Sequence, residues 1–209
     1  MSEITWRIFR IMAEFVEGFE FLSGSKREIT ILGSARLAKG SHWYNEAEKF
    51  GRLLGEKGFT IITGGGPGVM EAANKGAKES GAESIGINIQ LPHEQRQNEY
   101  VTRGRGFHYF FTRKVMLAAS AQAYVFFPGG FGTCDEFFDM ITLIQTKKAH
   151  PIPMICVGRE FWEPLYKWMR EQMLSHGTIN EEDLCLFHIV DSAEEAFELV
   201  KESEERTFF

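Results

Sequence analysis

A run of nine residues, 128–136 (PGGFGTCDE), combines glycines, a hydroxyl group and two carboxylates. It follows an apolar run, residues 123–127, which indicates a buried strand, and it precedes apolar residues at helical spacing. The glycines therefore lie where a strand ends and a helix begins, and the unpaired N–H groups there attract an anion. Thr133 adds a donor, and Asp135 and Glu136 follow within the first helical turn. Because a site for an anion alone disfavours nearby negative charge, we expect an anion on the loop and a sugar hydroxyl or a water facing the carboxylate.

Two other glycine stretches also follow predicted strands. Residues 64–68 (GGGPG) come after the strand at 59–63, and Gly33 ends the strand that begins at Glu28. Ser34 and Arg36 are candidate ligand contacts, although an ordinary strand-to-helix turn with a surface arginine explains them equally well. Neither stretch is a GxGxxG fingerprint, and the next strand ends without an acid, so the sequence disfavours NAD binding.

Arg113 and Lys114 follow an aromatic run, residues 107–111, that predicts a strand. Basic residues are unfavourable at the start of a helix, so a bound phosphate or the Glu136 carboxylate is the reason we expect for Arg113 there. His108 lies within the aromatic run and is interpreted as a core histidine, without a second histidine at ligand spacing. We therefore expect no metal site. Cys134 has no histidine to activate it and is interpreted as a packed thiol.

The composition is that of a packed globular protein. The chain has 209 residues, 44% of them hydrophobic, and a net charge of -6, which argues against binding to nucleic acid or to acidic membranes. Three cysteines cannot all pair, so we expect reduced thiols and a cytoplasmic location. The sequence shows no signal peptide and no run long enough to span a bilayer.

Strands alternate with helices along the chain, and most strands are continuous apolar runs. This pattern predicts a doubly wound (Rossmann-like) α/β fold, with a parallel sheet covered by helices on both faces and ligands beyond the carboxyl ends of the strands. Residues 4–22 predict an amphipathic helix, which gives an N-terminal helix over residues 1–24 and one domain over residues 25–209. We favour packing of this helix on its own domain; the alternative is that it covers a dimer partner.

The glycine-rich run matches the PGGxGTxxE motif, and residues 64–70 (GGGPGVM) and 112–114 (TRK) match two further motifs in the same order. Together they span residues 29–158 and resemble the LONELY GUY (LOG) family, formerly labelled lysine decarboxylases. The resemblance implies hydrolysis of the N-glycosidic bond of a nucleoside 5′-monophosphate, AMP-like or a cytokinin ribotide, to free base and ribose 5-phosphate, with no cofactor. It implies catalytic roles for Glu136 and Arg113, and a homodimer or larger homo-oligomer. The residues we expect to bind substrate are Gly129, Gly130, Gly132, Thr133, Gly64, Gly65, Gly66, Gly33, Ser34, Arg36 and Lys114.

The alternative function on the same scaffold is a non-catalytic carrier of a nucleotide or of molybdenum cofactor. A decarboxylase would need pyridoxal phosphate on a lysine with an acidic partner for the ring nitrogen, and only Lys114 is suggestive, so we reject it. Residues 91–100 are polar and irregular, and they are interpreted as a lid over the base or as a solvated connection.

Overall fold

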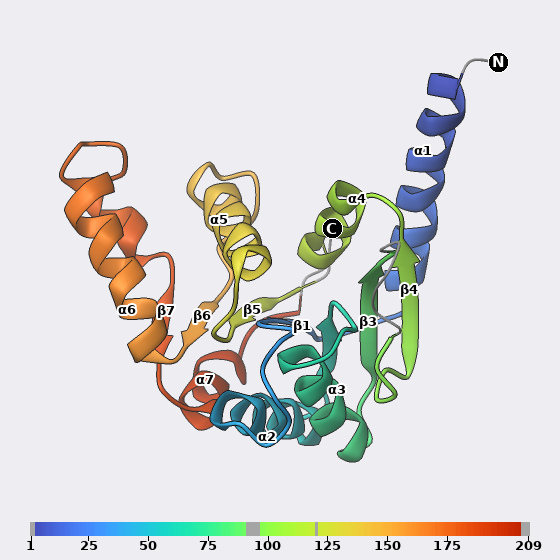
Figure 1. The fold of residues 1–209 in the computed structure, drawn as a ribbon, viewed down its shortest axis with the longest axis horizontal. Helices are drawn as coiled ribbons and strands as arrows, with labels where there is room; N and C mark the ends of the chain where they lie inside the picture. Colours follow the sequence, from blue (N-terminus) through green and yellow to red (C-terminus); the bar gives the residue numbers. More distant parts are fainter. Residues whose placement is uncertain (1–2, 91–96, 120, 206–209) are drawn as a thin grey trace.

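The computed structural model describes residues 3–90, 97–119 and 121–205 and confirms the doubly wound α/β fold (Figure 1). Within these residues seven parallel strands form one sheet in the order β4-β3-β2-β1-β5-β6-β7. The strands are β1 (Glu28–Leu32), β2 (Thr60–Thr63), β3 (Ser84–Ile89), β4 (Arg103–Phe107), β5 (Ala123–Phe126), β6 (Met154–Val157) and β7 (His188–Val190). Every residue of β1, β2, β3, β5 and β6 is buried, which explains why Glu28 is the one charged residue in these strands.

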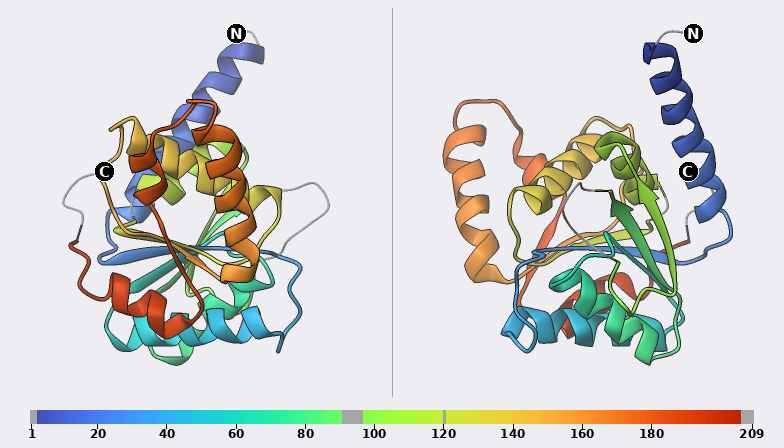
Figure 2. Two further views of the ribbon diagram at one scale, coloured as in Figure 1. Left: turned by 90° about the vertical axis from the view of Figure 1, so that its left-hand side faces the viewer. Right: turned by 45° about the vertical axis from the view of Figure 1, so that its right-hand side comes forward.

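Helices cover both faces of the sheet, as Figure 2 shows. One layer contains α2 (His42–Glu56), α3 (Val69–Glu79) and α7 (Ala193–Val200). The other contains α1 (Glu3–Leu22), α4 (Phe110–Ala119), α5 (Phe131–Gln145) and α6 (Arg159–Trp168). The last of these continues as a π-helix (Met169–Leu174), and a 3₁₀ helix (Glu181–Cys185) precedes β7. Among the helices of the described residues, none has the length and apolar character that a membrane crossing requires.

The direction of winding reverses between β1 and β5. The chain runs outward from β1 through β2 and β3 to β4, and then returns to add β5 on the other side of β1. The loops that leave β1 and β5 are joined at their carboxyl ends, because Phe127 N donates to Leu32 O and Ser34 N donates to Pro128 O. Ligands of doubly wound folds bind at such a reversal.

The predicted N-terminal helix forms, but its apolar stripe divides into two parts. Toward its end, Leu22 is buried and Phe15 and Phe19 pack against the core. Toward its beginning, Ile4 and Ile8 are exposed, as α1 projects beyond the other helices (Figure 1). Packing on its own domain therefore accounts for only the second half of the stripe.

The predicted strand at residues 107–111 is wrong in position. Strand β4 covers Arg103–Phe107 and overlaps the prediction only at Phe107; Gly104 and Gly106 weaken the apolar pattern in it. The aromatic run instead begins α4 at Phe110. His108 lies in the turn between them and is exposed, so it is not a core histidine.

Candidate functional site

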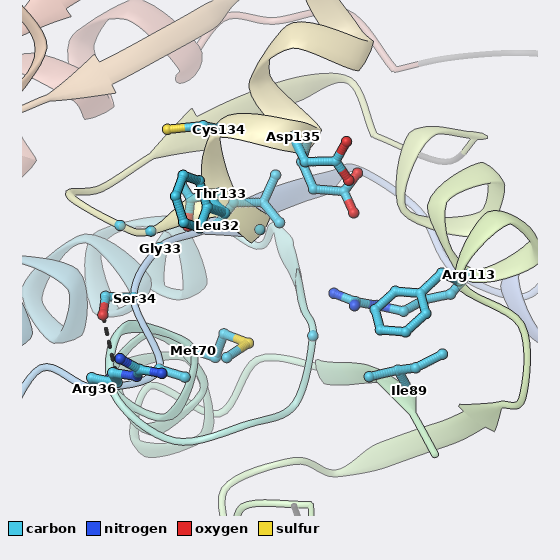
Figure 3. Close-up of a pocket in the computed structure, with 18 residues that line it drawn as sticks. Leu32, Gly33, Ser34, Arg36, Met70, Ile89, Arg113, Thr133, Cys134 and Asp135 are labelled. Carbon is cyan, nitrogen blue, oxygen red and sulfur yellow. Dashed lines mark hydrogen bonds between the residues drawn. The ribbon is translucent and has the colours of Figure 1, made fainter. Parts of the chain in front are cut away.

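A cavity of about 710 Å³ lies at the reversal point between β1 and β5. Its size is that of small-molecule sites in proteins, about 300–1,000 Å³. Figure 3 shows Arg113 reaching into it from one side, with Ser34 and Arg36 on the other. It is lined by Leu32, Gly33, Ser34, Ala35, Arg36, Gly64, Met70, Ile89, Phe110, Arg113, Gly129, Gly130, Phe131, Gly132, Thr133, Cys134, Asp135 and Glu136.

One wall of the cavity is the amino-terminal end of α5. Gly130 is the N-cap, and its carbonyl oxygen accepts hydrogen bonds from Thr133 N and Cys134 N, both at 3.1 Å. The amides of Phe131 and Gly132, in the first turn, have no acceptor within the helix. Gly129 packs so closely that a Cβ there would lie 2.1 Å from Thr133 Oγ1. The loop therefore presents backbone donors and the positive end of the helix dipole to the cavity.

The opposite wall is the loop after β1. Ser34 O accepts from Val69 N at 3.0 Å, which ties this loop to the start of α3. Gly68 makes that approach possible, because it has a φ of 68° and a Cβ there would lie 2.3 Å from Ser34 O. Arg36 N donates to Ser34 Oγ at 3.1 Å. Ser34 and Arg36 thus lie on a loop that is held to both neighbouring elements.

Three residues predicted to bind substrate are not in the lining of this cavity. Gly65 and Gly66 instead bind Asn98. Its backbone N–H donates to Gly65 O and its side-chain amide donates to Gly66 O, each at 2.9 Å. Lys114 instead pairs with Asp135 at 3.2 Å and with Asp139 at 3.5 Å. The predicted lid lies partly outside the described residues, namely at residues 91–96.

Glu136 is a buried acid in this site. Only 6% of it is exposed, and burial raises the pKa of its carboxyl group to about 7, although Arg113 and then Lys114 act in the opposite direction. The group is thus divided between its two protonation states near neutral pH. A carboxyl group with such a pKa is suited to exchanging protons at neutral pH.

Arg113 loses hydration in the same cavity, but its charge is positive. Burial lowers the pKa of its guanidinium group, while Glu136 and then Asp135 raise it. Its Nε is buried and has no hydrogen-bond partner in the described part of the chain. Buried polar groups are usually satisfied, so a guanidinium nitrogen without a partner in a cavity indicates that a ligand supplies one.

The apolar part of the lining was not predicted. Leu32 and Ile89 are the last residues of β1 and β3, and Met70 lies at the start of α3. Their positions, at the carboxyl ends of strands and just after a glycine loop, were the signal in the sequence that could have identified them as lining residues. Phe131 is 98% exposed at the cavity, which is unusual for a large apolar side chain.

Cys134 is half-buried in the lining, and burial raises the pKa of its thiol. The thiol therefore stays protonated at neutral pH, and a thiol in that state is a poor nucleophile.

The fold and this cavity define a doubly wound α/β protein with a ligand site at the reversal of its sheet. The sequence profile of the family described as "Possible lysine decarboxylase" matches residues 70–200. A cytokinin riboside 5′-monophosphate phosphoribohydrolase from Oryza sativa subsp. japonica is 31% identical over 86% of this chain and 73% of its own. A protein of the same description from Arabidopsis thaliana is 26% identical over 91% of this chain and 87% of its own. The chain belongs to the LOG family.

Solved structures with the same fold include a molybdenum cofactor binding protein from Rippkaea orientalis. It has a TM-score of 0.61 and 22% identity, and the match covers 85% of this chain and 97% of that one. The molybdenum cofactor carrier protein from Chlamydomonas reinhardtii matches with a TM-score of 0.59 and 22% identity, over 85% of this chain and 97% of its own. At these identities the likeness concerns the fold alone.

Proposed function

We propose that this chain hydrolyses the N-glycosidic bond of a nucleoside 5′-monophosphate, AMP-like or a cytokinin ribotide, and releases free base and ribose 5-phosphate. The observation that carries the proposal is that the buried carboxyl group of Glu136 and the half-buried guanidinium group of Arg113 line one cavity with the open amino-terminal end of α5. The names of the relatives from rice and Arabidopsis support the same reaction.

In this proposal the 5′-phosphate binds the amides of Gly129, Gly130 and Gly132 and the hydroxyl of Thr133, where the dipole of α5 favours negative charge. Arg113 supplies positive charge from the facing helix, and its unpartnered Nε donates to an oxygen of the substrate. Because the phosphate is remote from the bond that breaks, its binding energy fixes the ribose in a reactive position.

Glu136 acts on the ribose in its carboxylate form. Water attacks C1′ and gives a proton to the carboxylate, while the C1′–N bond breaks and the base leaves with the bonding electrons and takes a proton from solvent. A pKa of about 7 suits this role, because the carboxylate is then both available and basic enough to accept the proton. The same negative charge stabilises the positive charge that develops on the sugar.

The experiment incubates the protein with AMP, CMP, GMP and a cytokinin ribotide and measures free base by chromatography. We expect release from at least one monophosphate and far less from adenosine than from AMP. Glu136→Gln should lower the rate by about 10²–10⁴-fold, and Arg113→Ala should lower it too. Glu48→Gln is the matched control, because Glu48 pairs with Lys75 between α2 and α3, outside the cavity lining.

The second candidate is a carrier that binds a nucleotide or molybdenum cofactor without cleaving it, which the names of the two similar proteins of known structure suggest. It predicts tight binding of AMP or of the cofactor, with no base released from any of the four monophosphates. A different outcome, comparable turnover of adenosine and AMP, would contradict the proposal that phosphate binding positions the ribose.

We also propose that the protein is a homodimer or larger homo-oligomer through the exposed apolar side of α1. Trp6, Phe9 and Met12 are more than half exposed there, on a helix that projects from the domain. On α4, Phe110 and Phe111 are exposed as well. Monomeric proteins rarely leave large apolar patches in water, and a second copy would cover them.

A further inference from the structure

Glu14 of α1 binds the amino-terminal end of α4, although it lies 94 residues before His108 in the sequence. His108 N donates to its Oε1 at 2.7 Å, and Tyr109 N donates to its Oε2 at 3.3 Å. The hydroxyl of Thr112, which is fully buried, lies 2.5 Å from the same Oε2. One carboxylate thus accepts from the two backbone amides that lead into α4 and from a hydroxyl in its first turn.

Helix α4 has a particular need for this carboxylate. Its first turn contains no acid, and Arg113 and Lys114 place two positive charges near the positive end of its dipole. Such charges are unfavourable at that end, and a nearby negative charge stabilises it. Glu14 supplies from another helix the charge that the sequence of α4 lacks. Thr112 is also close in sequence to two residues that line the cavity. Arg113 directly follows Thr112, and Phe110 lies two residues before Thr112.

Several contacts hold α1 in place against α4 and the strand before it. Gly18 lies so close that a Cβ there would be 2.5 Å from Met116 Sδ, on α4. Glu17 forms a salt bridge with Arg105 of β4. Arg7 lies over the ring of Tyr109, 5.6 Å from its centroid. These contacts lie before and after Glu14 along α1, and they fix the position of Glu14 relative to α4.

We infer that Glu14 is a positioning residue, which holds α4 so that Arg113 reaches into the cavity. The Nε of Arg113 has no hydrogen-bond partner among the described residues, so the backbone of α4 largely sets where the guanidinium lies. The effect that we expect on catalysis rests on the proposed function, whereas the structural link from Glu14 to Arg113 does not.

The test compares Glu14→Ala, Glu14→Gln and Glu17→Gln with the wild type. We expect Glu14→Ala to lower kcat by about 10- to 100-fold, because small displacements of a catalytic group have effects of that size. The KM for AMP should change much less, since the glycine loop of α5 holds the phosphate. Glu14→Gln keeps one oxygen acceptor and should be intermediate. Glu17→Gln, one turn further along α1, weakens only a solvent-exposed contact with Arg105, and because such contacts contribute little to stability it should match the wild type.

A double-mutant cycle separates positioning from general loss of structure. If Glu14 acts through Arg113, then Glu14→Ala causes no further loss of kcat in an Arg113→Ala protein. A loss of the same size in both backgrounds, or an unchanged kcat in Glu14→Ala alone, overturns the inference.

A second readout does not need turnover. In Glu14→Ala we expect the amide protons of His108 and Tyr109 to exchange faster and the Arg113 Nε–H resonance to shift, with neither change in Glu17→Gln. If the wild type releases base from no monophosphate, the proposed function fails. Amide exchange and the Arg113 resonance still test whether Glu14 positions Arg113. An Arg113 resonance that stays unchanged in Glu14→Ala contradicts it.

Discussion

The charge of Glu136 should destabilise the folded protein, and Glu136→Gln measures by how much. Burial raises the pKa of this carboxyl group from 4.5 to about 7. Between these pH values the folded protein keeps a proton that the unfolded chain releases, so the contribution to stability is complete below pH 4.5 and is lost as pH rises through 7. The full difference corresponds to about 3 kcal/mol. The glutamine does not ionise and escapes this loss.

Urea unfolding followed by tryptophan fluorescence gives the free energy of unfolding of both proteins at pH 5 and pH 8.5. From the two pKa values, we expect the stability of Glu136→Gln relative to the wild type to rise by about 2.5 kcal/mol between these conditions. Glu48→Gln is the control, because it removes a carboxylate outside the cavity lining. A relative stability of Glu136→Gln that stays constant between pH 5 and 8.5 refutes the burial argument.

Three further changes test other parts of the site and surface. Arg113→Met removes the charge that lowers the pKa of Glu136, so the rising limb of kcat/KM against pH, expected near 7 in the wild type, should move to higher pH; an unmoved limb contradicts the coupling. Gly129→Ala places a methyl group 2.1 Å from Thr133 Oγ1, so calorimetry should show AMP binding at least about tenfold more weakly, and unchanged affinity speaks against the loop as the phosphate site. Trp6→Ser removes an exposed ring and should lower the mass measured by light scattering with no loss of secondary structure; an unchanged mass argues against assembly through α1.

The fold could be predicted because its central strands are buried on both faces and carry almost no charged residues. The prediction failed where that physical condition fails. In the edge strand β4, residues alternate between half-buried and exposed positions, and Gly104 and Gly106 weaken the pattern further. Periodicity also predicted α1 as a helix, but it does not say what covers each part of an apolar stripe. The exposed first half of α1 became visible only with tertiary structure.

The location of the site followed from a rule about parallel sheets, since each glycine stretch lies after the carboxyl end of a strand. Its electrostatics could not be predicted in the same way. The sequence predicted Glu136 in the first turn of a helix, where an acid is ordinarily a surface residue that complements the dipole. That prediction is wrong, because α5 begins at Phe131, its first turn contains no acid, and Glu136 lies in the second turn. Its raised pKa depends on burial by elements distant in sequence. The contacts of Glu14 with α4 are likewise invisible in a sequence, because nothing local marks an acid that caps another helix.

Glu136 and Arg113 also show why stability alone does not explain this cavity. Each loses hydration, and burial shifts the pKa of each toward its neutral form, so their mutual attraction only partly offsets the desolvation. Apolar side chains of similar size would avoid this loss. The charge that the proposed reaction requires is therefore the charge that destabilises the folded state. Glu136→Gln should be less active than the wild type, yet its stability relative to the wild type should be higher at pH 8.5 than at pH 5, whereas a substitution that merely damages the fold lowers stability and activity together.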